Sequence, residues 1–236
     1  MNGIEETLKE LDAGRVLDVA TQEGRFVQTL MDNLRSYTSV VGIDVNEAYI
    51  ERARDSIQSP DVSFLVMDAG ELEFEDESFD MVTISASLHH LEDVDRVLAE
   101  TRRVLRPGGR LLVLEMQRDT WTEPELTSIM LHEWAAAIDT ALGRLHNKTF
   151  TSGEILAHVE KLGLRNTRVS VHRDTDSDPM DQERVEMIRQ VIGVLIERAG
   201  QLPDSADLVA RGEELRRRLT EFGAQGEPVV LVTCEK

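Results

Sequence analysis

Three aspartates that follow apolar runs constrain the fold of this chain more than any other feature. Asp18, Asp44 and Asp68 each lie at or near the carboxyl end of such a run, at intervals of 26 and 24 residues. Helical patterns alternate with the runs, and this alternation is typical of parallel strands joined by right-handed crossovers. Open α/β sheets bind ligands at the carboxyl ends of their strands. We therefore expect the three carboxylates to face one crevice and to bind hydroxyl and amino groups of a nucleoside-like cofactor.

The hydrophobic pattern predicts strands and helices over the whole chain. Strands are predicted at 15–19, 39–43, 62–67, 79–84, 110–115, 166–172 and 228–234. Helices are predicted at 4–11, 23–34, 46–57, 92–105, 122–142, 151–162, 179–199 and 205–222. Asn46 is the expected N-cap of its helix, and Pro107-Gly108-Gly109 is expected to form a tight turn. The predicted fold is α/β, a doubly wound and mostly parallel seven-stranded sheet with helical cap insertions.

Domain organisation follows from the change of pattern after residue 116. We expect one domain over 1–236, with a cofactor-binding half at 13–116 and a helical substrate cap at 117–150 and 174–227. The helix at 179–199 has an apolar face that fits packing on the sheet, a lid over an apolar acceptor or a homodimer contact.

Composition excludes several classes of function. The net charge of −19 disfavours binding to nucleic acid phosphates, so no nucleic acid partner is expected. The single cysteine, Cys234, rules out an intrachain disulfide and a cysteine-cluster metal site. No stretch approaches the ~20 apolar residues of a membrane span, and the first residues do not resemble a signal peptide. A cytoplasmic enzyme is the expectation.

Several motifs occur in a fixed order on the predicted strand ends. They are VLDVATQEG at 16–24, GIDVN at 42–46, MDA at 67–69, FDMV at 79–82 with LHHL at 88–91, and LRPGGR at 105–110. In this order they resemble the class I S-adenosylmethionine-dependent methyltransferases. The resemblance is to the subgroup that includes ubiquinone/menaquinone C-methyltransferases and many small-molecule methyltransferases. It covers residues 13–116 and implies a Rossmann-like methyltransferase fold with S-adenosylmethionine as cofactor.

The resemblance assigns roles to residues at the ends of the second and third strands. Asp44 is expected to accept hydrogen bonds from both ribose hydroxyls, a charge-assisted pairing. Val45 is expected to pack on one face of the adenine. Asp68 is expected to accept from the adenine amino group, with the Ala69 backbone beside it. Taken singly, each aspartate could equally be a helix cap or a turn residue.

The loop after the first strand departs from the family pattern. The family has Gly-x-Gly-x-Gly where this chain has Ala20, Gln22 and Gly24, with Thr21 between the first two. Backbone N–H groups of this loop are expected to approach the methionine part of the cofactor. Asp18 is expected to support the loop or to bind the methionine amino group. The two changes are interpreted as tolerated drift, and the alternatives are altered cofactor geometry or a relative that binds the cofactor poorly.

Residues after the fourth strand are expected near the reacting sulfonium. Ser85 lies where backbone carbonyls hold the cofactor's amino group in the family. His90, next to His89, is a candidate for lining the cofactor and the catalytic site. The alternative is a structural histidine pair at the start of a helix.

A second polar group lies in the predicted cap. His132, Asp139 and His146 are spaced by seven residues, which on a continuous helix gives ~10 Å between successive members. That spacing is too long for one metal centre, so no metal is expected. His132 or Asp139 is the predicted general base or substrate anchor. The alternatives are a polar pocket lining and ordinary solvated side chains.

The predicted function is transfer of a methyl group from S-adenosylmethionine to a small-molecule acceptor by in-line displacement, with S-adenosylhomocysteine as product. One alternative is a non-catalytic binding or regulatory protein on the same fold, because of Ala20 and Gln22. A nicotinamide-dependent oxidoreductase is less favoured, since the Gly-x-Gly-x-x-Gly pattern is absent from the sequence. The sequence does not identify the acceptor, its nucleophilic atom, the use of a base or the oligomeric state.

Overall fold

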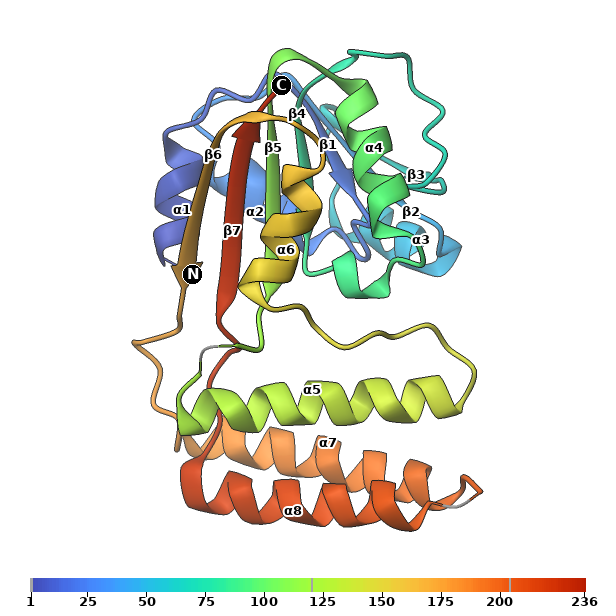
Figure 1. The fold of residues 1–236 in the computed structure, drawn as a ribbon, viewed down its shortest axis with the longest axis vertical. Helices are drawn as coiled ribbons and strands as arrows, with labels where there is room; N and C mark the ends of the chain where they lie inside the picture. The colour runs from blue at the N-terminus through green and yellow to red at the C-terminus, as the bar shows by residue number, and fades with distance from the viewer. Residues whose placement is uncertain (1, 120, 204) are drawn as a thin grey trace. The chain divides into compact units, whose positions relative to one another are not determined.

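The chain forms two compact units in the computed structural model, which describes residues 2–119, 121–203 and 205–236 (Figure 1). Unit 1 comprises Met1–Glu115, Gly153–His172 and Val230–Lys236, and unit 2 comprises Met116–Ser152 and Arg173–Val229. The two segments of unit 2 start and end within two residues of the expected cap segments. The substrate-binding role of the cap stays a prediction.

Unit 1 contains a seven-stranded sheet in the order β3-β2-β1-β4-β5-β7-β6. Its strands are β1 Arg15–Val19, β2 Ser39–Asp44, β3 Val62–Val66, β4 Phe79–Ser85, β5 Leu105–Met116, β6 Arg165–His172 and β7 Val229–Glu235. The pairs β1–β2, β1–β4, β2–β3 and β4–β5 are parallel. β7 runs opposite to β5 (Figure 1). The predicted fold class, doubly wound and mostly parallel, is confirmed.

Helices connect the strands as the alternating pattern predicts. They are α1 Asn2–Lys9, α2 Arg25–Asn33, α3 Glu47–Ser56, α4 Val94–Val104 and α6 Ser152–Glu160. The expected N-cap at Asn46 is confirmed, since its side chain accepts a hydrogen bond from the Ala48 N–H at 3.0 Å. A short 3₁₀ helix, Leu88–His90, was not predicted.

The start of β5 corrects one prediction. β5 begins at Leu105 and not at Arg110, so Pro107-Gly108-Gly109 lies inside the strand. The expected turn is present there as an irregularity, since Gly108 has φ +76° and the register with β4 passes from Phe79–Leu105 directly to Met81–Arg110. The Gly108 N–H donates to the Lys236 carbonyl at 2.8 Å, and the Lys236 N–H donates to the Gly109 carbonyl at 3.0 Å. Pairing with the far end of the chain extends the strand, and local sequence carries no signal for it.

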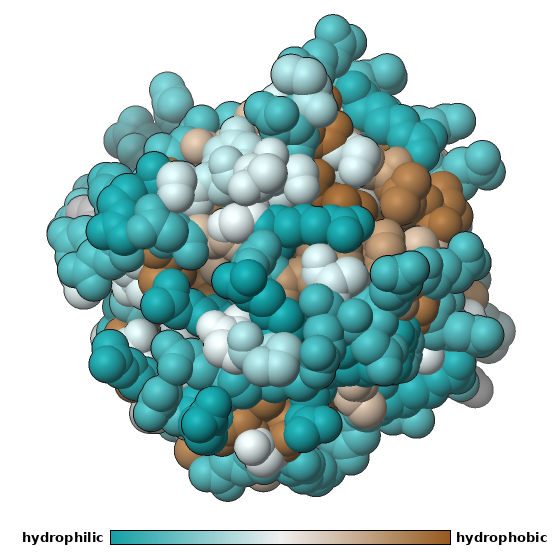
Figure 2. Space-filling view, turned by 90° about the horizontal axis from the view of Figure 1, so that it is seen from above, coloured by the Kyte–Doolittle hydropathy of each residue, from teal (hydrophilic) through white to brown (hydrophobic). Residues whose placement is uncertain are grey.

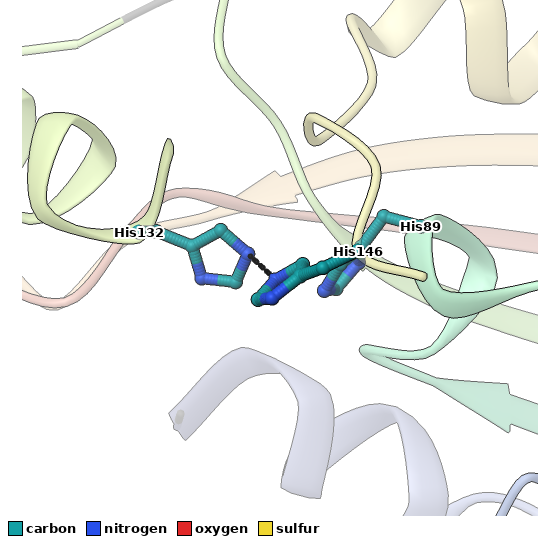
Figure 3. A group of neighbouring side chains, drawn as sticks. All are labelled: His89, His132 and His146. Atoms are coloured by element: carbon teal, nitrogen blue, oxygen red, sulfur yellow. Dashed lines mark hydrogen bonds between the residues drawn. The ribbon is translucent and has the colours of Figure 1, made fainter. Parts of the chain in front are cut away.

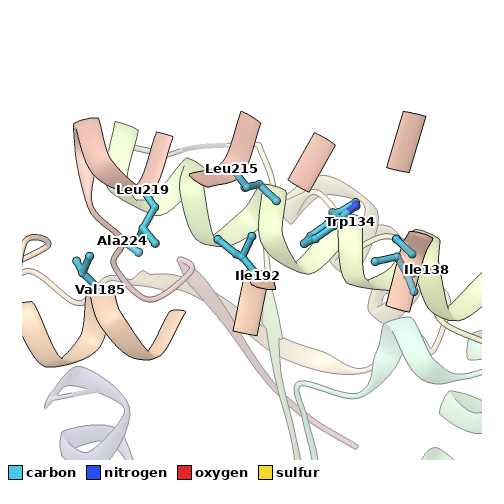
Figure 4. Close-up of a cluster of buried hydrophobic side chains, with 8 residues drawn as sticks. Trp134, Ile138, Val185, Ile192, Leu215, Leu219 and Ala224 are labelled. Atoms are coloured by element: carbon cyan, nitrogen blue, oxygen red, sulfur yellow. The ribbon is translucent and has the colours of Figure 1, made fainter. Parts of the chain in front are cut away.

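Unit 2 is built on three long helices: α5 Glu123–Ala141, α7 Gln182–Gly200 and α8 Ala206–Phe222. Their shared core, drawn in Figure 4, includes Trp134, Ile138, Ile192, Leu215 and Leu219. The Trp134 Nε1–H donates to the Leu208 carbonyl at 2.8 Å, which satisfies the polar atom of a buried ring. Over the described ranges, no helix has the length and apolar content needed to cross a membrane. The cytoplasmic location stays a prediction.

A polar hollow lies at the amino ends of the parallel strands. It has a volume of about 480 Å³ and is lined by residues that include Asp12, Thr38, Asp80 and Arg106. Its charges are paired within the wall, as in the 2.7 Å contact between Arg106 and Asp80. This hollow lies at the edge of the sheet opposite to Asp18 and Asp44.

The molecular face seen from above is mostly hydrophilic, as expected for a chain with a net charge of −19 (Figure 2).

The packing of unit 2 predicts opposite effects for two glycines in helix interiors. A Cβ at Gly212 would lie 2.5 Å from Ile196 Cγ1 and 2.7 Å from Trp134 Cζ2, whereas one at Gly193 would meet only Arg216 at 3.5 Å. Gly212→Ala should therefore lower the free energy of unfolding by ~1–3 kcal/mol through overpacking. Gly193→Ala should raise it by ~1 kcal/mol through helix propensity. Urea denaturation measures both, and a stabilised Gly212→Ala variant would contradict this packing.

Candidate functional site

The strand register brings the first two aspartates to one edge of the sheet. Asp18 pairs with Gly42 in β1–β2, and Asp44 pairs with Val66 in β2–β3. Asp68 follows two residues after Val66. The carboxyl ends of β1, β2 and β3 therefore form the candidate cofactor edge, as the sequence predicts.

Asp18 is buried, with 1% of its surface exposed. Its carboxylate accepts hydrogen bonds from the Thr21 and Thr83 hydroxyls, each at 2.6 Å. Burial raises the pKa of Asp18 to about 6; the two threonine hydrogen bonds oppose this shift and the charge of Asp44 adds to it. These contacts fit the expected role of supporting the first loop.

The Asp44 carboxylate accepts a hydrogen bond from the backbone of the first loop. Its Oδ2 accepts from the Gln22 N–H at 3.0 Å, and its Oδ1 accepts from the Asn46 N–H at 2.9 Å. An ionised carboxylate has about four lone-pair positions, so further acceptor capacity remains for two hydroxyl donors. The Thr21 N–H donates to the Ile43 carbonyl at 2.8 Å, which ties the loop to the same strand.

The first loop has left-handed backbone at the three positions where the family has glycine. The φ angles are +54° at Ala20, +50° at Gln22 and +79° at Gly24. The loop thus has the conformation that glycine would allow at those positions. The Gln22 side chain is exposed, so it points outward. Each non-glycine residue in this region costs about 1–2 kcal/mol, and strain of this kind concentrates at functional sites.

The third expected carboxylate lies in an exposed turn after β3. Asp68 Oδ1 accepts from the Gly70 N–H at 2.8 Å, and Ala69 is buried beside it. Val45, directly after Asp44, is 68% exposed. An exposed apolar side chain directly after Asp44 fits a surface on which a purine ring could stack.

The segment after β4 packs against the first loop. The Ser87 hydroxyl lies 3.1 Å from the Ala20 carbonyl and 2.8 Å from the Ser85 carbonyl, so it can donate to either. His90 is exposed, whereas His89 is buried with its Nδ1 3.0 Å from Glu115 Oε1. The adjacent histidines therefore lie in different environments.

Sequence reasoning missed three residues that organise this edge: Thr83, Ser87 and Glu115. Besides its contact with His89, Glu115 accepts from the Leu88 N–H at 2.7 Å through Oε2. The available signal was the presence of Thr83 and Glu115 inside runs that are otherwise apolar. A polar residue buried in a strand needs a partner.

His132 and Asp139, the predicted base or substrate anchor, lie in unit 2, and the His146 side chain connects them. His146 Nδ1 is 3.1 Å from Asp139 Oδ2, and His146 Nε2 is 3.1 Å from His132 Nε2 (Figure 3). His132 Nδ1 lies 3.8 Å from Glu227 Oε1. The structure thus joins His132 and Asp139 through His146, which the sequence analysis did not select as a base.

The left-handed loop predicts the effect of restoring the family's glycines. Ala20→Gly and Gln22→Gly each relieve ~1–2 kcal/mol of backbone strain and cost ~0.5–1 kcal/mol of backbone entropy. We expect each free energy of unfolding to be unchanged or higher by up to ~1 kcal/mol. The control Ala99→Gly, at an exposed position of α4, should lose ~1 kcal/mol. Equal losses at positions 20 and 99 in urea denaturation would refute the left-handed loop.

The burial of Asp18 predicts a pH dependence of stability. Between the ordinary pKa of 3.8 and the native value of about 6, the folded chain holds a proton that the unfolded chain has released. The contribution of Asp18 to stability therefore falls as the pH rises through this window, by about 3 kcal/mol in total. Asp18→Asn removes the titration, so the variant should gain up to ~3 kcal/mol relative to the wild type from pH 4 to pH 7. A constant difference between the two unfolding curves would contradict the burial.

Comparison with known proteins identifies the cofactor half. Residues 17–113 match the family model of the methyltransferase domain. The ubiquinone/menaquinone biosynthesis C-methyltransferase of Marinomonas sp. (strain MWYL1) is 33% identical over 134 residues, which are 55% of this chain and 52% of that protein. The phthiotriol/phenolphthiotriol dimycocerosates methyltransferase 1 of Mycobacterium ulcerans is 33% identical over 165 residues, 70% of this chain and 57% of that protein.

One solved structure shows the fold at lower identity. A phosphoethanolamine N-methyltransferase 2 of Haemonchus contortus has a TM-score of 0.60 and 18% identity over 100% of this chain and 52% of that chain. The chain matches only about half the length of its first curated relatives. The expected family is confirmed for the cofactor half: residues 17–113 are a class I, S-adenosylmethionine-dependent methyltransferase domain, similar to that of the ubiquinone/menaquinone C-methyltransferases.

Proposed function

We propose that the chain binds S-adenosylmethionine at the carboxyl ends of β1, β2 and β3 and transfers its methyl group to a small-molecule acceptor. The observation that carries this proposal is the first loop, whose left-handed positions coincide with the family's three glycines and whose Gln22 N–H donates to Asp44. The names of the two curated relatives, both small-molecule methyltransferases, support the acceptor class.

The cofactor would be held by contacts that the chain is already arranged to make. Asp44 would accept from the ribose hydroxyls with the lone pairs that Gln22 and Asn46 leave over. Val45 would stack on the adenine, and Asp68 with the Ala69 backbone would bind its amino edge. The first loop, Thr21 included, would hold the methionine part.

The reaction itself is a displacement at the methyl carbon. The acceptor's nucleophile forms a bond to this carbon while the carbon–sulfur bond breaks, and the sulfur keeps the electron pair as a neutral thioether, S-adenosylhomocysteine. The protein contributes orientation and exclusion of water. A proton lost by the acceptor would pass to His132, with His146 and Asp139 behind it. Ser85 and His90 are assigned to the side of the reacting sulfonium.

A second candidate is a protein that binds the cofactor without catalysis, or binds it poorly. Ala20 and Gln22 favour it, because they place Cβ atoms at two positions where the family has glycine.

A homodimer contact through α7 and a cytoplasmic location belong to the proposal as well. The exposed Met187, Val191 and Val194 of α7 support the dimer contact.

Binding of S-adenosylhomocysteine tests the cofactor assignment. Asp44→Ala removes an acceptor of two charge-assisted hydrogen bonds and should weaken binding at least ~100-fold. The control Asp55→Ala, an exposed carboxylate of α3, should bind like the wild type. Isothermal titration calorimetry measures the affinity of the wild type, Asp44→Ala and Asp55→Ala for S-adenosylhomocysteine, and circular dichroism verifies that each is folded. Asp44→Asn serves as a milder variant.

Two results would refute this assignment. One is a wild-type chain that does not bind S-adenosylhomocysteine at high micromolar concentration, or that binds nicotinamide nucleotides instead. The other is an Asp44→Ala variant that is folded and retains the wild-type affinity. Binding without methyl transfer to any quinone precursor or phenolic acceptor would favour the non-catalytic candidate.

A further inference from the structure

Two imidazole rings of unit 2 lie close together with their planes nearly perpendicular, at 86° (Figure 3). The Nε2 atoms of His132 and His146 are 3.1 Å apart, and the side chains are only 19% and 12% exposed. The Thr140 hydroxyl contacts the His146 carbonyl at 3.3 Å, so the backbone of His146 is held as well as its ring. The pair is therefore a fixed arrangement and not two solvated side chains.

The outer nitrogen of each ring faces a carboxylate. His146 Nδ1 lies 3.1 Å from Asp139 Oδ2, and His132 Nδ1 lies 3.8 Å from Glu227 Oε1. Only the Asp139 contact is short enough for a hydrogen bond, and it favours the His146 tautomer that carries its proton on Nδ1 and leaves the lone pair on Nε2. The two Nε2 atoms, 3.1 Å apart, can therefore share either a proton or a metal ion.

The end of α5 explains how residues spaced along a helix come together. His132 and Asp139 are on α5, about 10 Å apart by helical rise. The helix ends at Ala141, and Gly143, at φ +77°, turns the chain back. His146 consequently reaches both residues. The ~10 Å spacing that disfavoured a metal centre applies to a continuous helix. His146 lies beyond the end of α5, so that spacing does not apply to it.

We propose that His132 and His146 bind one divalent transition-metal ion through their Nε2 atoms. Two nitrogens bound to a tetrahedral zinc at 2.0–2.1 Å are about 3.3 Å apart, close to the separation found here. Imidazole pairs suit zinc, copper and nickel, whereas magnesium and calcium require oxygen ligands. The Asp139 carboxylate at His146 Nδ1 is the kind of partner that orients a metal-binding histidine.

Asp139 is itself held in place on its other oxygen. Its Oδ1 lies 3.3 Å from an Arg144 nitrogen and 3.9 Å from an Arg198 nitrogen. These arginines contact Oδ1 and leave Oδ2 to His146. They fix the carboxylate that orients the ring, and thereby fix the direction of the His146 lone pair.

The two protein ligands leave coordination positions for water or for an acceptor oxygen. A bound metal ion would lower the pKa of such an oxygen and so help it to lose a proton, which is the role otherwise assigned to His132 as a base. The metal site itself is a property of unit 2 and does not depend on methyl transfer. Zinc binding and S-adenosylhomocysteine binding by the wild-type chain are separate measurements, so either proposal can fail alone.

Calorimetric titration of the chelator-treated full chain with zinc chloride at pH 7.5 tests the site. The wild type should bind one equivalent. His132→Ala and His146→Ala should each weaken binding at least ~100-fold, and Asp139→Asn should weaken it ~10–100-fold. Lower pH should also weaken binding, because protons compete for the imidazoles. The matched control is His158→Ala, which removes a histidine of unit 1 whose Nδ1 contacts Asp95 at 2.6 Å, and it should bind zinc like the wild type.

Folding of each variant is verified by circular dichroism, and His132→Gln and His146→Gln serve where the alanine variants unfold. Zinc should raise the melting temperature of the wild type and of His158→Ala only. A wild-type chain that binds no zinc at high micromolar concentration would overturn the proposal and leave a shared proton between the rings. Folded His132 and His146 variants that bind zinc as tightly as the wild type would overturn it too.

Discussion

The buried carboxylate of Asp18 is the interaction on which the candidate cofactor edge depends. It joins Thr21 of the first loop to Thr83 of β4, so one side chain links a loop and two neighbouring strands. Burial of a carboxylate is costly unless hydrogen bonds satisfy it. The two hydroxyls offset only part of that cost, since the pKa stays raised to about 6. Burial of this carboxylate, which holds the loop in shape, therefore lowers the stability of the folded chain.

The rest of the loop is held by bonds to its backbone. The Gln22 N–H binds Asp44, the Thr21 N–H binds the Ile43 carbonyl, and the Ser87 hydroxyl contacts the Ala20 carbonyl. Several anchors on a short segment can impose a left-handed backbone on Ala20 and Gln22 despite the strain. Two of the family's three glycines are therefore replaced without a change of backbone conformation. The backbone is left-handed at Ala20, Gln22 and Gly24.

Local sequence predicted the elements of this fold well, because each parallel strand is a short apolar run that ends at a polar residue. β1, for example, has the predicted bounds Arg15–Val19. Two features depended on contacts between distant residues and were missed. β5 is extended by pairing with Lys236, and His146 reaches His132 only because the chain turns back after α5. Thr83 and Glu115 are visible in the sequence as polar residues in apolar runs, but their partners are not.

A crystal structure of the chain with S-adenosylhomocysteine tests the central claim most directly. We expect the ribose hydroxyls within hydrogen-bonding distance of Asp44, the adenine against Val45 near Asp68, and the methionine part along Ala20 to Gly24. Ligand density elsewhere, for example in the polar hollow lined by Asp12 and Arg106 at the opposite edge of the sheet, would contradict it.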